Sequence, residues 1–456
     1  MGATPTISFG DAMSKNPVRL FQWATVAICM LVLVCDGIDM QLLGIVAPRV
    51  IKDFAVSRGA FGIAMSAALV GFGLGSWGGG WLGDVIGRRY ALAVAALVFS
   101  LGTVAASRAD GVTVMAMWRV VSGLGFGACY ANALAMASEW LPERLRPVSV
   151  ATLSVGTPIG GSVVGWLGPL LAEDYGWRGT FVVFGLSTLL LVVIILIVLR
   201  DSPSFLLARG KPEQAAITAR KVIDGDVELK PETHDMDTAG GVSIGVLHPS
   251  NARMNIGVGL AFAACALVAY GILNWTTTML SPPLRGFTLP QAGAVIGVAG
   301  ITSMAGSVAA GVFTRQFGSK LVMAVISASL VVLLIGSCIV VQTLPAVPDE
   351  GERMIVTILI GVLAAMFSAG IATMYVIMAL GYPQSCRSAG IGFGIFMSRV
   401  GAVAASAFGG ALLDFGKGSV IPFFAVLGIG AVLVSAAAFI VDRHVPPLRK
   451  AASKAH

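Results

Sequence analysis

Four ionisable side chains interrupt stretches of the sequence that are otherwise apolar: Asp36, Asp39, Arg119 and Arg399. An ionisable residue at the centre of a membrane-spanning helix costs about 2.5–3.5 kcal/mol on insertion scales. Such a residue therefore persists mainly where it faces a partner charge or a polar space. Carboxylates in this setting can bind and release protons, and guanidinium groups can hold anions. These four residues are therefore the candidates for chemistry within the chain.

Asp36 and Asp39 are three residues apart, so a helix would present both carboxylates on one face. Two carboxylates that lie close together repel each other, and this favours keeping a proton on one of them. Proton uptake and release within a membrane is the chemistry that a proton-coupled carrier requires. The alternative interpretation is that both carboxylates only satisfy neighbouring charges and fix the register of the helices.

The two arginines lie at depths that suit contact with the centre of a bundle. With a rise of about 1.5 Å per residue, Arg119 lies about 10 Å from the outer end of its helix and Arg399 about 16 Å from the inner end of its own. The aspartates fall at a depth similar to that of Arg119, so an ion pair between them is feasible. Because a guanidinium binds a carboxylate through two parallel hydrogen bonds, we expect the ligand to be an organic anion. Structural pairing is the alternative, or, for Arg399, snorkelling toward the interface.

The elements that must position these residues are long apolar helices. The chain has 456 residues, of which 56% are hydrophobic and 12% charged, whereas soluble domains carry about 25% charged residues. This composition excludes disordered, disulfide-stapled and ordinary soluble classes and indicates a polytopic membrane protein. Since a spanning helix needs about 20 mostly apolar residues, we predict twelve spans. They lie near 22–46, 58–81, 90–107, 112–138, 148–171, 178–199, 254–280, 291–312, 320–343, 354–379, 388–413 and 420–441.

The predicted spans fall into two groups of six. The predicted order is an N-terminal tail (1–21), a first six-helix bundle (22–199), a polar linker (200–252), a second six-helix bundle (253–441) and a C-terminal tail (442–456). Within the linker, the segment 211–221 is expected to form a short surface helix. Six plus six spans around a linker is the organisation of a repeat-built transporter. We therefore expect an all-α membrane protein in which two pseudo-symmetric bundles surround a central cavity.

Lysine and arginine set the predicted orientation. With both termini placed inside, 20 of these residues lie on the cytoplasmic side, 8 on the other side and 2 within spans. Basic residues concentrate on the cytoplasmic side of membrane proteins, so we predict cytoplasmic termini in a plasma membrane or bacterial inner membrane. The same distribution explains the net charge of +7 without a nucleic-acid partner.

Several kinds of chemistry have no signature in the sequence. The six cysteines form no CxxC pair and no histidine lies in a predicted span, so we expect no metal site and no disulfide framework. No phosphate-binding loop or dinucleotide-binding motif is present, which argues against an ATP-driven motor and against a cofactor. No nucleophile with a matching base is visible, so we do not expect an enzyme.

The loop between the second and third predicted spans combines two glycines with three charges: Gly83, Asp84, Gly87, Arg88 and Arg89. Glycines permit close helix approach and a tight turn, and the charges can form a lock at the cytoplasmic end. The segment 80–92 resembles the GxLaDrxGRkxxL loop signature of the major facilitator superfamily, with Val85 in place of the usual basic residue. The resemblance implies the major facilitator fold and a cytoplasmic gate. A plain positively charged loop is the alternative.

Further motifs resemble the aromatic acid:proton symporter family within that superfamily. The stretch 36–39 is similar to its DGxD pattern, the loop 142–146 to its PERxR pattern, and the stretch 382–401 to its YP…R…G…R pattern. The resemblance implies a monomeric carrier in the lipid bilayer. It also implies that the cargo is an aromatic carboxylate of the hydroxybenzoate or benzoate class, imported together with protons.

The same resemblance implies roles for particular residues. Asp36 or Asp39 would take the proton, and Arg119 or Arg399 would hold the substrate carboxylate. Aromatic side chains near the cavity suit a ring-bearing substrate through stacking and apolar burial. The candidate contacts are Trp275, Tyr270, Tyr130 and Tyr375, together with Asn274 of the seventh span. Ordinary helix packing is the alternative for the tyrosines, and a place in the interfacial aromatic belt is the alternative for Trp275.

Two segments depart from these patterns or add to them. The second copy of the loop signature, expected at 311–320, has Thr314 where an acidic residue is usual and Ser319 where a basic one is frequent, so a second lock would be weaker. The segment 156–161 (Gly-Thr-Pro-Ile-Gly-Gly) is similar to an antiporter motif, and we interpret it as packing and hinge chemistry. The sequence leaves open a proton-driven exporter, a symporter of another organic anion and a non-transporting membrane sensor.

Overall fold

Twelve membrane passes make up the fold. The computed structural model describes residues 6–223, 228–230, 245–383 and 386–447. Within them, eleven helices are long and apolar enough to cross a membrane. One of these, α7 (Gly156–Val198), changes direction at Gly176, where φ is 68°. Together with α6 (Arg146–Ser154) it contains both the fifth and the sixth predicted spans, so the prediction of twelve spans is confirmed.

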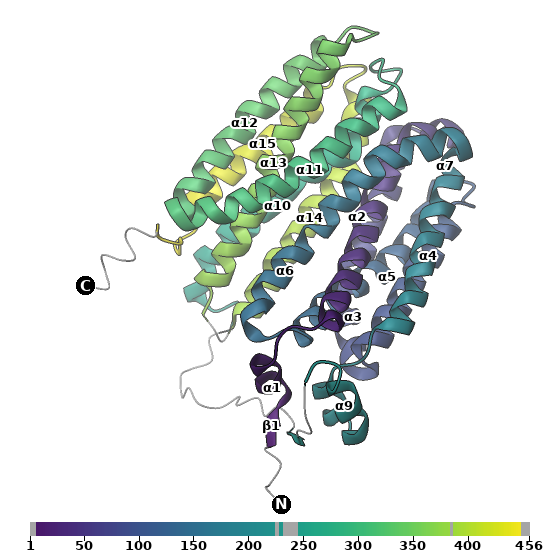
Figure 1. Cartoon of the computed structure of the whole chain (residues 1–456). Coiled ribbons are helices and arrows are strands. Elements are labelled where there is room, and N and C mark those ends of the chain that lie inside the picture. Colours follow the sequence, from purple (N-terminus) through teal and green to yellow (C-terminus); the bar gives the residue numbers. More distant parts are fainter. Residues whose placement is uncertain (1–5, 224–227, 231–244, 384–385, 448–456) are drawn as a thin grey trace, which may run out of the picture.

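The first six passes form one bundle, coloured from purple to teal in Figure 1. Besides α6 and α7, its helices are α2 (Leu20–Phe54), α3 (Arg58–Ile86), α4 (Arg88–Ala106) and α5 (Val112–Glu139). Small residues let the backbones approach: at Gly75 of α3, an added Cβ would lie 2.0 Å from the carbonyl oxygen of Leu124 in α5. Large apolar side chains such as Trp77 and Trp81 of α3 remain exposed, as is common in a chain that lies in lipid.

The last six passes form the second bundle. Its helices are α10 (Ala252–Leu280), α11 (Leu289–Phe317), α12 (Ser319–Thr343), α13 (Glu350–Gly381), α14 (Arg387–Phe415) and α15 (Ile421–Ile440). The two bundles share the same turn between their second and third passes. Gly87 between α3 and α4 and Gly318 between α11 and α12 both have a left-handed backbone, with φ of 95° and 83°, which favours glycine. This equivalence agrees with the predicted pseudo-symmetry.

Short elements gather where the chain passes from the first bundle to the second, which we call the linker end. They are β1 (Thr6–Ser8), α1 (Phe9–Lys15), α8 (Pro203–Ala208), α9 (Pro212–Ala219) and β2 (Glu228–Lys230), with β1 and β2 paired in parallel. Phe9 packs edge-on against Trp140 beyond α5, with ring centroids 5.9 Å apart. The short helix predicted within 211–221 corresponds to α9. Other parts of the predicted tails and linker lie outside the described residues.

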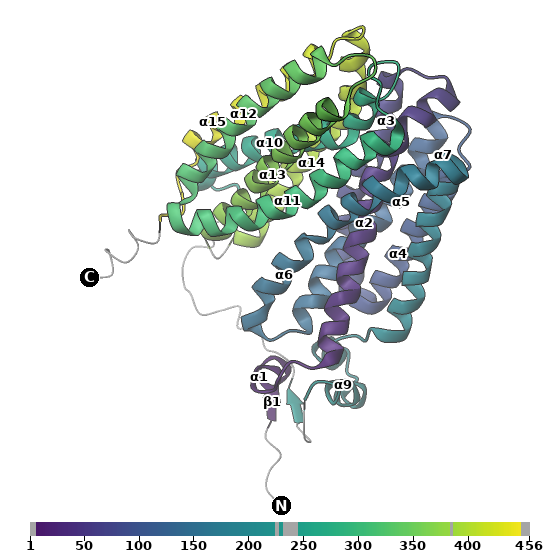
Figure 2. The same cartoon turned by 45° about the horizontal axis from the view of Figure 1, so that its top comes forward.

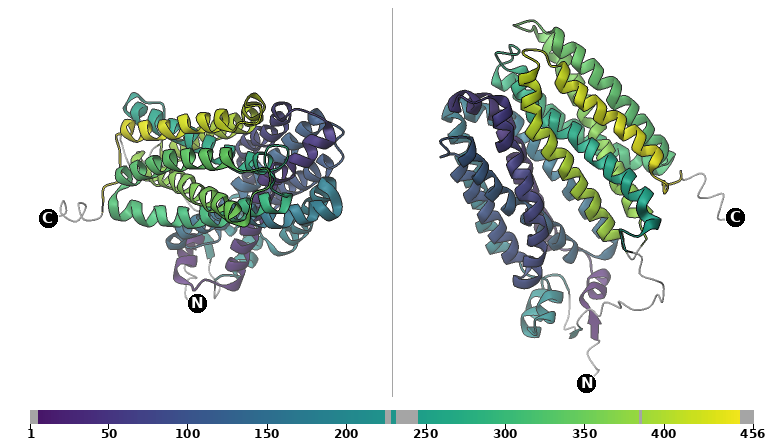
Figure 3. Two further views of the ribbon diagram at one scale, coloured as in Figure 1. Left: turned by 90° about the horizontal axis from the view of Figure 1, so that it is seen from above. Right: turned by 180° about the vertical axis from the view of Figure 1, so that it is seen from behind.

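The two bundles meet at the opposite end, which we call the far end, and diverge toward the linker end (Figure 3). At the far end, Thr277 of α10 donates to the carbonyl oxygen of Gly44 in α2 at 2.7 Å. Arg58 at the start of α3 lies 3.3 Å from Asp414 near the end of α14. Helix α11 also lies against α7 (Figure 2). These contacts bring α2, α3, α10 and α14 together at the centre of the molecule.

Candidate functional site

Asp39 and Arg119 form a buried ion pair between α2 and α5. Arg119 Nη1 lies 2.7 Å from Asp39 Oδ2, and the side chains of Arg119 and Asp39 are only 2% and 3% exposed. Arg119 Nη2 also donates to the Asp39 carbonyl oxygen at 3.1 Å, and Thr103 of α4 donates to the second carboxylate oxygen at 3.0 Å. The feasible Asp–Arg pairing is therefore present. Arg119 Nη1 and Nη2 are both engaged by Asp39 in this conformation, while Nε is buried and has no hydrogen-bond partner among the described residues. The expectation that Arg119 holds the substrate carboxylate therefore stays a prediction.

Asp36 faces a different helix. Its side chain is 2% exposed, and Oδ2 accepts a hydrogen bond from the Thr157 hydroxyl of α7 at 3.0 Å. The other carboxylate oxygen, Oδ1, is buried and has no hydrogen-bond partner among the described residues. Leaving a buried charge short of partners is costly, whereas a protonated carboxyl needs fewer of them. Asp36 is therefore suited to carry a proton, whereas both carboxylate oxygens of Asp39 already have partners in Arg119 and Thr103.

Arg399 of α14 reaches across the boundary between the bundles. Its Nη1 donates to the Tyr270 hydroxyl of α10 at 2.9 Å. Its Cζ lies 3.8 Å from the centroid of the Phe72 ring of α3, a cation–π contact. The side chain is half-buried, and among the described residues its Nε has no hydrogen-bond partner. Arg399 thus keeps hydrogen-bonding capacity for an anion while its flat face rests on an aromatic ring.

Aromatic rings and hydroxyl groups surround this guanidinium. Arg399 interacts electrostatically with Tyr270, Tyr375, Tyr130 and Asp36. The Tyr130 ring meets Phe72 edge-on, with centroids 5.8 Å apart, and Tyr375 remains 38% exposed. The structure therefore gathers three predicted aromatic candidates, Tyr270, Tyr130 and Tyr375, around the predicted arginine. Phe72 was missed by the sequence analysis.

Trp275 and Asn274 lie between α10 and α14 and not at an open surface. Trp275 is fully buried, and its Nε1 donates to the carbonyl oxygen of Ala405 at 3.2 Å. Asn274 Nδ2 donates to the Ser406 hydroxyl at 2.8 Å. Both side chains hold α10 against α14, the helix that carries Arg399. In this conformation the Trp275 indole is enclosed by neighbouring helices and not at an exposed interface, and its contact with substrate stays a prediction.

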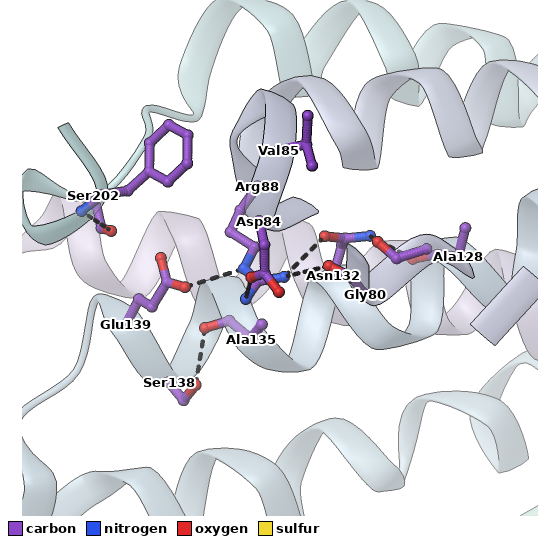
Figure 4. A network of polar contacts seen from close by, with 12 residues as sticks. Gly80, Asp84, Val85, Arg88, Ala128, Asn132, Ala135, Ser138, Glu139 and Ser202 are labelled. Atoms are coloured by element: carbon purple, nitrogen blue, oxygen red, sulfur yellow. Dashed lines mark hydrogen bonds and ion pairs between the residues drawn. The ribbon is translucent and has the colours of Figure 1, made fainter. Parts of the chain in front are cut away.

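The residues of the predicted gate are linked through Arg88 (Figure 4). Arg88 lies 2.6 Å from Asp84 and 3.0 Å from Glu139 of α5. Its Nη1 donates to the carbonyl oxygen of Gly80 at 3.2 Å. Asn132 fastens α5 to α3 by donating to the carbonyl oxygen of Gly79 at 2.8 Å. The charges thus tie three helices of the first bundle together, while the Asp84 side chain stays 68% exposed.

The other gate residues close the turn between α3 and α4. The Arg89 backbone N–H donates to Asp201 at 2.9 Å. Burial raises the pKa of the Asp201 carboxyl, although this N–H opposes the shift. An added Cβ at Gly83 would lie 2.0 Å from Asn132 Oδ1, so the Asn132 side chain would have to move, whereas the positive φ of 95° at Gly87 favours glycine whatever the space around it.

Two further observations concern metals and thiols. In the part of the chain that the structure describes, no group of three or more His, Cys, Asp or Glu side chains could hold a metal ion. The six cysteines, all within that part, are free thiols.

Comparisons with known proteins agree with this architecture. The sequence profile described as Major Facilitator Superfamily matches residues 29–367. The chain is 28% identical over 443 residues to the gallate transporter of Pseudomonas putida, covering 96% of this chain and 95% of that protein. It is 27% identical over 414 residues to the 4-hydroxybenzoate transporter PcaK of Pseudomonas aeruginosa, covering 89% of each. The solved D-xylose–proton symporter has the same fold, with a TM-score of 0.70 at 16% identity over 93% of this chain and 98% of that one.

Proposed function

The chain belongs to the Major Facilitator Superfamily, and we propose that it imports an aromatic carboxylate together with protons. It is a secondary transporter in a membrane and not an enzyme, since the relatives across nearly its whole length are named transporters. Those relatives are named for gallate and 4-hydroxybenzoate, which are benzoates with ring hydroxyls. Their names support the hydroxybenzoate class as the substrate of this chain.

The surroundings of Arg399 carry the proposal. A benzoate carboxylate would accept hydrogen bonds from the guanidinium edge that includes Nε, which has no partner among the described residues. The ring would lie among Phe72, Tyr130 and Tyr375, whose faces and edges suit stacking. The Tyr270 hydroxyl supports the guanidinium from the other side. Arg399 thereby replaces Arg119 as the favoured carboxylate ligand.

Asp36 is the favoured proton carrier. Its unpartnered Oδ1 and its near-complete burial support a carboxyl that alternates between neutral and ionised forms. Arg399 lies within electrostatic range, so a bound carboxylate at Arg399 would alter the field at Asp36. Asp39, paired with Arg119, is in this proposal a fixed charge that anchors α2 to α5.

The distribution of basic residues supports a cytoplasmic linker end with both termini inside, in a plasma membrane or bacterial inner membrane. In that orientation the described conformation is the inward-facing one, since the bundles diverge toward the linker end. Import then requires rocking of one bundle against the other around the central site. The gate around Arg88 would rearrange during this step, and a single chain suffices for the cycle.

Uptake of radiolabelled 4-hydroxybenzoate into proteoliposomes, with an inward proton gradient, tests the proposal. We expect accumulation that a protonophore abolishes and that unlabelled benzoate, but not an aliphatic acid of similar size, inhibits. Inhibition by the aliphatic acid alone would indicate another organic anion as the substrate. Movement only against the proton gradient would indicate an exporter, and binding without flux would indicate a sensor.

A further inference from the structure

The helical segment that faces Asp36 has a local irregularity at Val155, two residues before the threonine that contacts the carboxylate. Helix α6 ends at Ser154 and α7 begins at Gly156, but Val155 between them keeps helical dihedral angles (φ −79°, ψ −14°). The Val155 N–H donates to the Thr152 carbonyl oxygen at 3.1 Å, and the Ile159 N–H makes a regular i→i−4 bond to the Val155 carbonyl oxygen at 3.1 Å. Pro158 has no N–H with which to bond the Ser154 carbonyl oxygen, which explains a local irregularity at this point. The segment interpreted from sequence as a hinge therefore contains a proline irregularity in the fifth pass, and its role as a hinge stays a prediction.

Thr157 connects this proline irregularity to the proposed proton carrier. Its hydroxyl donates to Asp36 Oδ2 at 3.0 Å. The two backbones are in close contact here, since an added Cβ at Gly37 would lie 2.0 Å from the Thr157 carbonyl oxygen. The packing therefore fixes the hydroxyl against the carboxylate.

Several other groups reach Asp36 through their charges. The titratable or charged residues that interact electrostatically with it are Asp39 and Cys35 on α2, Cys129 and Tyr130 on α5, and Arg399 on α14. Thr157 is the residue that the structure shows hydrogen-bonded to its side chain. A change in this one bond should therefore directly alter how strongly the Asp36 carboxyl group binds its proton.

We propose that Thr157 is a positioning residue for the proton carrier, which holds the ionised Asp36 and links its protonation to the proline irregularity where α6 passes into α7. The hydroxyl donates to the ionised carboxylate, and it can instead accept from the protonated carboxyl. The first bond is the stronger one because its acceptor is charged. When Asp36 loses its proton, the hydrogen bond that joins α2 to the start of α7 therefore becomes stronger. This inference rests on the proposed function of Asp36.

The pH dependence of uptake by Thr157→Val and Thr157→Ser tests the proposal. Valine keeps the shape of threonine but cannot donate a hydrogen bond. The ionised form of Asp36 then loses the bond from residue 157, so Asp36 keeps its proton to higher pH. We expect the pH of half-maximal uptake, measured at a fixed pH difference across the membrane, to rise by about one unit in Thr157→Val. Thr157→Ser should restore the profile of the unmodified protein.

Controls separate this role from a purely structural one. Thr25→Val removes a buried hydroxyl from the same helix as Asp36, where it donates to the carbonyl oxygen of Phe21, and it should leave the profile in place. Thr157→Ala provides a second donor-free variant if valine is not tolerated. An unshifted profile with reduced uptake in the donor-free variants would overturn the inference. Failure of the proposed function is distinct, because uptake by the unmodified protein would then not respond to a protonophore.

Discussion

The guanidinium of Arg399 is shared by both halves of the protein. It meets the Tyr270 hydroxyl within its own bundle and the Phe72 ring of the other. A lysine at this position would keep the positive charge but would lose the planar fork that binds a carboxylate through two hydrogen bonds. The shape of the cation, and not only its charge, is therefore expected to determine affinity.

Replacing Arg399 by lysine is expected to raise the KM for 4-hydroxybenzoate about ten- to a hundredfold, since a hydrogen bond to a charged group contributes about 1.5–3 kcal/mol. Initial uptake rates over a range of substrate concentrations measure this change. Arg285→Lys is the matched control, because Arg285 donates to the carbonyl oxygens of Val341 and Gln342 away from the site. An unchanged KM in Arg399→Lys would contradict carboxylate binding at this residue.

The four ionisable residues could be found from the sequence because their burial in apolar helices is costly, but most of their partners could not. Asp36 and Asp39 share one helical face, yet Asp39 meets Arg119 and Asp36 meets Thr157. Spacing in the sequence defines a face, whereas partner choice depends on how α2 is rotated against α5 and α7. Phe72 carried no signal, since nothing in the pattern separates it from the other 21 phenylalanines.

At the scale of helices, packing within the first bundle depends on where side chains are missing. Gly75 of α3 lies directly against the α5 backbone, whereas Gly73, half a turn earlier, has no atom within 4 Å of an added Cβ. The sequence showed an excess of glycine, 57 in all. It could not show which glycines face a neighbouring helix, because that also depends on helix rotation.

Gly75→Ala is expected to destabilise the protein by about 1–3 kcal/mol, because backbone atoms of α5 must move to admit the methyl group. Gly73→Ala is expected to leave stability unchanged or to raise it by up to about 1 kcal/mol, since alanine is the better helix former. Thermal unfolding of the purified proteins in detergent compares the two variants. Equal melting temperatures would show that the close approach of α3 and α5 contributes little.

At the scale of the whole molecule, the apolar pattern predicted twelve passes in two groups, but not how the groups sit against each other. The pattern records which segments prefer lipid, and this preference is the same in every state of a transporter. The contacts that close the far end, such as Arg58 with Asp414, join segments that are far apart in the sequence. No local signal identifies such pairs. The sequence also did not predict that α2 continues to Phe54, beyond the predicted end of its span at 46.

Asp414→Asn is expected to favour opening of the far end, because it weakens the ion pair with Arg58 and the bond from the Gly59 N–H. A partly exposed pair contributes about 0.2–1 kcal/mol, so the open population should rise about one-and-a-half- to fivefold. The readout is the rate at which an impermeant maleimide labels Ala407→Cys, above the background of the native thiols.

Asp53→Asn is the control for this measurement. Asp53 pairs with Arg178 at the same end, but both residues belong to the first bundle. Its removal should leave the labelling rate unchanged. Equal labelling in Asp414→Asn and in the parent chain would contradict a role for the Arg58–Asp414 pair in closing the far end.

Proton entry driven by substrate tests the central claim most directly. Proteoliposomes loaded with a pH-sensitive dye, without any initial gradient, would receive 4-hydroxybenzoate from outside. We predict that the interior acidifies as the substrate enters, and that Asp36→Asn abolishes the acidification. The protonated acid also crosses the bilayer passively, and liposomes without protein measure the acidification that this causes. Entry of labelled substrate through the protein with no acidification above those liposomes, or with an alkaline shift, would contradict proton-coupled import.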